Sequence, residues 1–333
     1  MTYKFLKSAC IISSVLFTFP SSAAETWKMA LGDGMGSTQE VLGLKFAEIV
    51  KEKTGGEISI EIFPGGQLGS EQATATDVST GTLEMSVLGS NNLAPFSPSM
   101  GILALPYIFE NIDQAKTILE GDIGKGLAED VIENADIRIV GWTYSGYRMV
   151  TNSKQPITSL ADLASISIRV PKTEILIGSF EAWGGNPTPI AWSETFTALQ
   201  QKVVDGQTAP YAAISSMKFG EFQSYLTEMS FMYQLEPLIM SETLFQKQSP
   251  EVQTIILEAG STSSEHALAW LNEKEDSIKE ELRTKYDVKI DVLTDEPEWV
   301  KLAQEKVWPE FFDQVGGKEK VNEFLKALGR EEL

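Results

Sequence analysis

The chain has 333 residues, of which 42% are hydrophobic, and carries a formal net charge of −20. This length and hydrophobic content suffice for about two globular domains with real cores. A surface this acidic repels phosphate backbones and anionic lipid headgroups, so nucleic acid and membrane surfaces are poor candidates for partners.

The N-terminal segment has the layout of a secretory signal peptide. Two lysines precede an apolar run over 9–19, and small residues follow up to Ala24. The run is shorter than the ~20 apolar residues that a membrane-spanning helix needs. We therefore predict that residues 1–24 are cleaved and that the mature protein is periplasmic. Cleavage removes Cys10, the only cysteine, so we expect no disulfide, iron–sulfur cluster or thiolate metal site. We also expect no cofactor.

The residues that follow have the pattern of a βαβ unit. We predict a strand over 27–31, a helix from Ser37 to the glycine pair at 55–56, and an alternating strand over 57–62. Ser37 and Glu40 have the spacing of a capping box. A right-handed crossover between parallel strands places a ligand crevice at their carboxyl ends.

The same alternation returns in the middle of the chain and indicates a second α/β lobe. Strands are predicted over 137–141 and 166–170, and helices over 159–164 and 173–183.

The C-terminal third is predominantly helical. Helical spacing runs from Ser249 almost to Tyr286, with an interruption expected at Gly260, and resumes over 296–308 and 319–328. A helix as long as the first is expected to brace both lobes.

Six segments, in order and spread over most of the chain, resemble the substrate-binding subunits of tripartite ATP-independent periplasmic (TRAP) transporters, the family typified by the C4-dicarboxylate-binding component. They are Phe63–Glu71, Gly81–Met85, Leu105–Phe109, Pro156–Ile157 with Leu160–Leu163, Ile168–Pro171 and Ala198–Gln207.

The resemblance implies a two-lobed, periplasmic-binding-protein-like α/β fold that closes over one ligand, with a long helix bracing both lobes. It places 25–146 and 235–274 in lobe I, and 147–234 and 275–333 in lobe II. The expected partners are a small organic anion and the membrane permease subunits of a TRAP transporter, and we expect a monomer.

Arg169 is the first candidate for contact with the ligand. It faces away from the apolar side of its predicted strand, and Pro171 ends that strand. A guanidinium offers a planar pair of donors that matches a carboxylate. In the family, the arginine of this Arg-Val-Pro motif binds the substrate carboxylate. The alternative is a structural ion pair.

Further candidates come from the same resemblance. Arg148 matches a second family arginine, for which an interlobe ion pair is an equal alternative, and Trp192 falls where some members place a ring against the ligand. Short polar groups able to bond a ligand, and rings near the presumed cleft, complete the set; they are Asp33, Ser90, Asn92, Tyr211 and Tyr233.

One position departs from the family pattern. Ala209 stands where many members carry an asparagine that holds the carboxylate. Either Gln207 or Thr208 takes that role, or a water does, or the arginines act alone. The identity of the acid therefore cannot be transferred from better-known relatives.

The composition argues against most catalytic sites. The chain has a single histidine, His266, and no Gly-x-Ser-x-Gly motif. A cysteine–histidine nucleophile and multi-histidine metal sites are excluded after cleavage. We therefore predict a binding protein and not an enzyme. The alternatives are a secreted carboxylate-using hydrolase or lyase, and a ligand-sensing partner of a membrane receptor.

Overall fold

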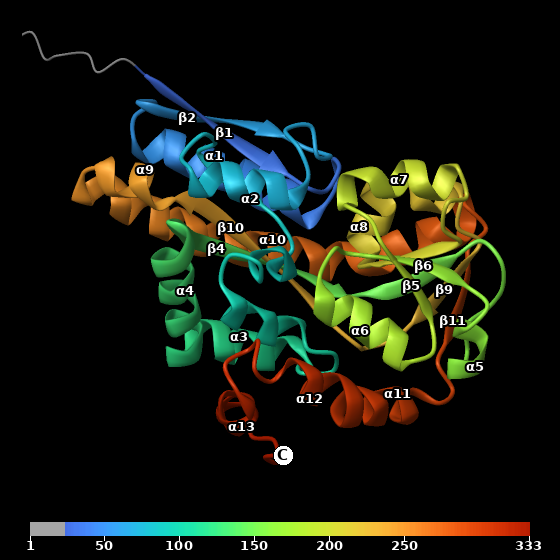
Figure 1. Ribbon diagram of the computed structural model, residues 1–333. Coiled ribbons are helices and arrows are strands. Elements are labelled where there is room, and N and C mark those ends of the chain that lie inside the picture. Colours follow the sequence, from blue (N-terminus) through green and yellow to red (C-terminus); the bar gives the residue numbers. More distant parts are fainter. Residues whose placement is uncertain (1–23) are drawn as a thin grey trace, which may run out of the picture.

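The computed structural model describes residues 24–333, which form two neighbouring α/β lobes with one long helix running across both (Figure 1). The predicted signal peptide lies, except for Ala24, outside the described residues. In the described part of the chain, no helix is long and apolar enough to cross a membrane. The predicted two-lobed α/β fold is confirmed.

The first lobe is built on a five-stranded sheet in the order β2-β1-β3-β10-β4. Its strands are β1 (Glu25–Leu31), β2 (Ile58–Phe63), β3 (Met85–Val87), β4 (Ile137–Tyr147) and β10 (Tyr233–Ser241). Helix α1 (Thr38–Lys53) joins β1 to β2, and these strands are parallel, so the predicted βαβ unit is confirmed. Ser37 Oγ accepts the Glu40 amide, but the Glu40 carboxylate accepts the amide of Gly36. Only half of the predicted capping box therefore forms.

Short helices cover this sheet and one end of it. They are α2 (Glu71–Ser79), the 3₁₀ turns η1 (Ser90–Leu93) and η2 (Pro98–Ala104), α3 (Ile112–Glu120), α4 (Asp122–Ala135) and α9 (Glu242–Lys247). Helix α2 begins at Glu71 because Ser70 Oγ accepts the amide of Ala73 at 3.3 Å. This cap fixes Glu71 at the carboxyl end of the sheet, next to η1.

The second lobe contains a six-stranded sheet in the order β11-β9-β5-β8-β6-β7. Its strands are β5 (Met149–Asn152), β6 (Ser167–Val170), β7 (Asn186–Pro189), β8 (Gly206–Ala209), β9 (Tyr225–Glu228) and β11 (Lys289–Val292). Its helices are α5 (Leu160–Leu163), α6 (Glu174–Ala182), α7 (Trp192–Gln200), α8 (Tyr211–Ser216) and the turn η3 (Phe219–Glu221). The strand predicted over 166–170 and the helix predicted over 173–183 are present with slightly shorter bounds.

The chain passes between the sheets at adjacent places. Strand β4 of the first sheet continues through Arg148 into β5 of the second, and β9 of the second returns through 229–232 to β10 of the first. The amide of Arg148 donates to the Met232 carbonyl at 2.9 Å. A backbone hydrogen bond thus joins the two crossing segments.

Helix α10 (Pro250–Lys285) is continuous over 36 residues and packs against both lobes. The interruption predicted at Gly260 is wrong. A Cβ atom at this glycine would lie 1.6 Å from the carbonyl oxygen of Val140 in β4. Glycine is required here because the helix backbone approaches the strand too closely for any side chain.

The C-terminal segment returns from the second lobe to the first (Figure 1). It comprises α11 (Glu296–Leu302), a π-helical turn η4 (Ala303–Val307), α12 (Trp308–Phe311) and α13 (Lys318–Ala327). The indole of Trp308 donates to the Pro106 carbonyl at 2.9 Å, and Arg330 Nη1 donates to the carbonyls of Tyr107 and Ile108. The lobe boundaries given above remain a prediction.

Candidate ligand-binding site

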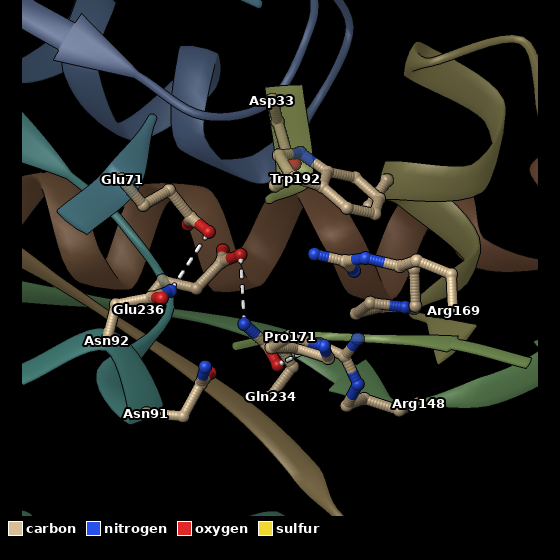
Figure 2. A pocket seen from close by; sticks show the side chains of 13 residues that line it. Asp33, Glu71, Asn91, Asn92, Arg148, Arg169, Pro171, Trp192, Gln234 and Glu236 are labelled. Carbon is tan, nitrogen blue, oxygen red and sulfur yellow. Dashed lines mark hydrogen bonds between the residues drawn. The ribbon is translucent and has the colours of Figure 1, made fainter. Parts of the chain in front are cut away.

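A buried cavity lies where the two sheets meet, beside the crossing segments (Figure 2). Its volume is about 20 Å³, room for about one water, because the lobes lie close together. The residues that line it are Asp33, Glu71, Asn91, Asn92, Arg148, Arg169, Pro171, Trp192, Ala209, Pro210, Ala213, Gln234 and Glu236.

Arg169, the first candidate for contact with a ligand, enters the cavity from β6 in the second sheet. It is 2% exposed, its Nε donates to the Ile190 carbonyl at 2.8 Å, and its Nη1 has no hydrogen-bond partner among the described residues. Its guanidinium lies 5.3 Å from the ring centroid of Trp192. Burial, with the nearby charge of Arg148, lowers the pKa of Arg169 to about 9, so it remains a cation at neutral pH.

Arg148 occupies the crossing between β4 and β5 and is 4% exposed. Its Nη1 donates to Gln234 Oε1 at 2.8 Å, and its Nη2 donates to the carbonyl of Thr208. These partners come from different sheets, so Arg148 links the two lobes with neutral acceptors and not through the direct ion pair considered from the sequence. Burial lowers its pKa to about 10, against the raising effect of nearby carboxylates.

Three other predicted residues line the cavity. Trp192, the first residue of α7, packs edge-on against Phe219 at 5.3 Å. Its Nε1 makes no hydrogen bond of normal geometry within the described chain, but it lies close enough to Asp33 to counteract the rise in the pKa of that carboxyl. Asn92, in η1, donates to Glu71 Oε2 at 2.9 Å. Asp33 follows β1; its Oδ2 is buried without a partner in the part of the chain that the structure describes.

The other four predicted residues are buried but do not line this cavity; they are Gln207, Ser90, Tyr211 and Tyr233. The Gln207 amide donates to Thr151 Oγ1 at 3.0 Å, and the Tyr211 hydroxyl donates to Glu228. The Tyr233 ring packs against Tyr147. Their contact with a ligand remains a prediction. Ala209 itself does line the cavity.

Sequence reasoning missed two carboxylates of the cavity, Glu71 and Glu236. Glu71 ends the segment 63–71 that resembles the family, but no role was predicted for it. Its Oε1 accepts the Gly89 amide at 2.7 Å. Glu236 lies in β10, a strand whose nine residues are all buried. The available signal was the pair Gln234 and Glu236, two polar side chains in an apolar strand at the spacing that puts them on one face.

The carboxyl groups of this cavity hold protons more tightly than usual. Glu236 accepts Ser145 Oγ at 2.5 Å and Gln39 Nε2 at 3.0 Å, yet burial raises its pKa from 4.5 to about 7. Burial, with the charges of Glu236 and Glu71, raises the pKa of Asp33 well above its ordinary value. Burial also raises the pKa of Glu71.

Comparison with known proteins identifies the family that has this architecture. Residues 34–314 match the family described as bacterial extracellular solute-binding protein, family 7. A solute-binding protein of Roseobacter denitrificans is 33% identical over 250 residues, covering 74% of this chain and 76% of that protein. The 2,3-diketo-L-gulonate-binding periplasmic protein of Escherichia coli is 28% identical and covers 84% of each chain.

Solved structures agree. A TRAP periplasmic solute-binding protein of Roseobacter denitrificans with bound L-galactonate has a TM-score of 0.84 and 28% identity, covering 91% of this chain and 98% of that one. A sugar acid-binding protein of Advenella mimigardefordensis in complex with galactonate has a TM-score of 0.87 and 25% identity, with coverage of 92% and 98%. The chain therefore belongs to solute-binding protein family 7, the periplasmic substrate-binding proteins of TRAP transporters.

Proposed function

We propose that this chain captures a small organic acid through a salt bridge between Arg169 and the ligand carboxylate. The observation that carries the assignment is the buried Arg169 Nη1, which faces the cavity without a partner among the described residues. An unpaired buried donor on a charged group is costly, so its retention is best explained by a ligand that pairs it. A carboxylate supplies two acceptor oxygens in the matching plane. Carboxylates bound to the solved relatives support this choice.

Capture requires the lobes to separate and close. Arg169 and Arg148 are 2% and 4% exposed, so a ligand reaches them only when the cleft opens. Groups from both sheets line the cavity, and a ligand that touches both favours the closed form by its extra contacts there. Arg148, at the crossing, supplies a second positive charge close to the bound acid.

The rest of the function follows from this mode of capture. Residues 1–24 act as a cleavable signal peptide that delivers the protein to the periplasm, as expected for a relative of periplasmic proteins. The protein works as a monomer and changes no covalent bond in its ligand. Its closed form is the shape that the membrane permease subunits recognise, and they carry the acid across the membrane.

The test is calorimetric titration of the mature protein with organic acids that raise its unfolding temperature in a screen. We expect one-to-one binding and no product. Arg169→Lys keeps the charge but loses the planar fork, so affinity should fall by about tenfold or more. Arg283→Lys, at an exposed position of α10, is the matched control and should bind as the unaltered protein does. Product formation, or full affinity in Arg169→Lys, would contradict the proposal.

A further inference from the structure

Two glycines of the first lobe lie directly against the second lobe. A Cβ atom added at Gly34, which follows β1, would lie 2.8 Å from the carbonyl oxygen of Ser216, the last residue of α8. A Cβ atom added at Gly66, in the turn after β2, would lie 2.8 Å from the Cβ atom of Ser193 in α7. All four residues are half-buried and none lines the cavity. The two glycines therefore form a rim outside the cavity, at the edge of the contact between the lobes.

This glycine rim is held rigidly within the first lobe. The amide of Gly65 donates to the Asp33 carbonyl at 2.7 Å, and the amide of Gly66 donates to the Leu31 carbonyl at 2.9 Å. These hydrogen bonds fix the turn after β2 to the segment that follows β1. The two glycines therefore move as one unit.

The atoms that face the rim are equally fixed. Ser216 presents a backbone oxygen and Ser193 a Cβ atom, and neither changes position when a side chain rotates. A hydrogen bond from Gln72 Nε2 in α2 to the Lys172 carbonyl at 3.2 Å also joins the two lobes. A methyl group added to the rim would fit only if a helix of the second lobe, or that lobe as a whole, moved away.

The two glycines differ in why a side chain is excluded. Gly66 has φ +72°, a conformation that residues with a side chain rarely adopt, so its own turn favours glycine. Gly34 is not among the residues with positive φ, so its backbone conformation is open to alanine. The nearest atoms that a Cβ at Gly34 would meet all belong to the second lobe, in Ser216 and Met217. The opposite lobe alone thus requires glycine at position 34.

We propose that Gly34 and Gly66 set how far the lobes close, because only residues without a side chain let the two edges meet around a bound ligand. The inference rests on the proposed function, which takes the closed form to be the one that holds the acid. A Cβ atom 2.8 Å from a backbone oxygen is closer than real Cβ atoms lie, so a side chain here would keep the lobes apart. The ligand would then lose contacts that favour the closed form. The glycines are positioning residues and do not touch the ligand.

Gly34→Ala tests this role by titration of the mature protein. The probe is L-galactonate, which is bound to a solved relative, or, if it does not raise the unfolding temperature, the acid that raises it most in the screen. Affinity should fall by about tenfold or more, through faster dissociation at an unchanged association rate. The unfolding temperature without ligand should not change, because the open form has room for the methyl group.

Gly126→Ala is the matched control, since its new Cβ meets nothing within 4 Å, and it should bind as the unaltered protein does. Full affinity in Gly34→Ala, or a clear drop in the unfolding temperature of that variant without ligand, overturns the role of this glycine.

A double variant tests the second point of contact. Gly66→Ala should weaken binding and also lower stability, because alanine is strained at φ +72° in the open and closed forms alike. Ser193→Gly removes the Cβ atom that the new methyl group meets. Adding Ser193→Gly to Gly66→Ala should restore most of the lost affinity and leave the loss of stability in place. Affinity that stays low in the double variant refutes the contact at Gly66.

Closing itself can be followed between two dyes. Cys10 lies in the predicted signal peptide, so Leu44→Cys in α1 and Val203→Cys after α7 give the mature protein two exposed cysteines, one on each lobe. The probe acid should shorten the distance between the dyes in the otherwise unaltered protein, and less so when Gly34→Ala is added. If no acid binds or shortens this distance, the proposed function is wrong and the inference falls with it. If acids shorten it equally in both proteins, the proposed function stands and only the role of the glycine rim is refuted.

Discussion

The two sides of the cavity hold their charges in different ways. On the second lobe, Arg169 makes one hydrogen bond through Nε, and its Nη1 has no partner among the described residues. On the first lobe, Glu236 is surrounded by donors from α1, β4 and β10. The contrast indicates that Arg169 has a donor left for a ligand, whereas the hydrogen bonds of Glu236 are already made within the protein.

Both sides of the cavity depend on the packing of α10 against β4, and Gly260→Ala should disrupt that packing. The added methyl group would meet the Val140 carbonyl at 1.6 Å, so the free energy of unfolding should fall by about 3 kcal/mol. Gly126→Ala, in α4 with nothing within 4 Å of the new Cβ, should change stability little or raise it by up to about 1 kcal/mol. Denaturant unfolding measures both. Equal stabilities would refute the close contact.

Arg148→Met tests whether the crossing depends on its guanidinium. The variant leaves Gln234 Oε1 and the Thr208 carbonyl without their buried donor, which should lower the free energy of unfolding by about 2 kcal/mol. It also removes a positive charge next to three acids. The measurement is again denaturant unfolding, with Arg283→Met as the exposed control. A variant as stable as the control would show that Arg148 serves the ligand alone.

Arg169→Met should separate binding from folding. The thioether side chain still covers the Trp192 ring but offers the ligand no donor, so binding of the captured acid should weaken by at least ~2 kcal/mol, roughly thirtyfold. The free energy of unfolding should change by no more than about 1 kcal/mol, because the lost bond to Ile190 is offset by removal of a buried cation. A large loss of stability in Arg169→Met would show that Arg169, like Arg148, is needed for folding as well as for binding.

The last prediction concerns how stability depends on pH through Glu236, on the first-lobe side of the cavity. The pKa of Glu236 is about 7 in the folded protein against an ordinary 4.5, so the folded state binds this proton more tightly than the unfolded chain. The stability linked to this proton is complete below pH 4.5 and is lost as the pH rises from 4.5 to about 7. Glu236→Gln should flatten this fall in unfolding titrations, and Asp122→Asn should preserve it. An unchanged slope in Glu236→Gln would contradict the raised pKa.

Local patterns predicted one side of the cavity better than the other. Strand alternation and a neighbouring proline set the direction of Arg169 within five residues, and the resemblance of its Arg-Val-Pro motif to the family implies its role. The carboxyl groups on the other side of the cavity come from three distant positions, Asp33, Glu71 and Glu236. No local pattern predicts that β10 pairs with β3, or that Gln39 donates to Glu236. Such pairings arise from tertiary packing of distant segments.

The error at Gly260 has a related cause. A glycine within a helical pattern marks either an end or a close approach, and only the position of the strand opposite decides between them. Thr208 shows the same limit. It is one of the alternatives that could replace the family asparagine; in the structure its carbonyl accepts from Arg148, and its contact with a ligand remains a prediction. The sequence predicts which segment lies beside the cavity, whereas the direction of its backbone groups depends on tertiary packing.

The continuous helix α10 constrains how the two lobes could move relative to each other. Its first half packs with the first lobe through Ile256, Ala259 and Ala267, and its second half with the second lobe through Leu271 and other residues. The backbone contact at Gly260 leaves the first half no room to slide. In the proposed opening of the cleft, α10 would bend between these halves or shift its second half over α8, so the bending stiffness of this helix would limit how far the lobes separate.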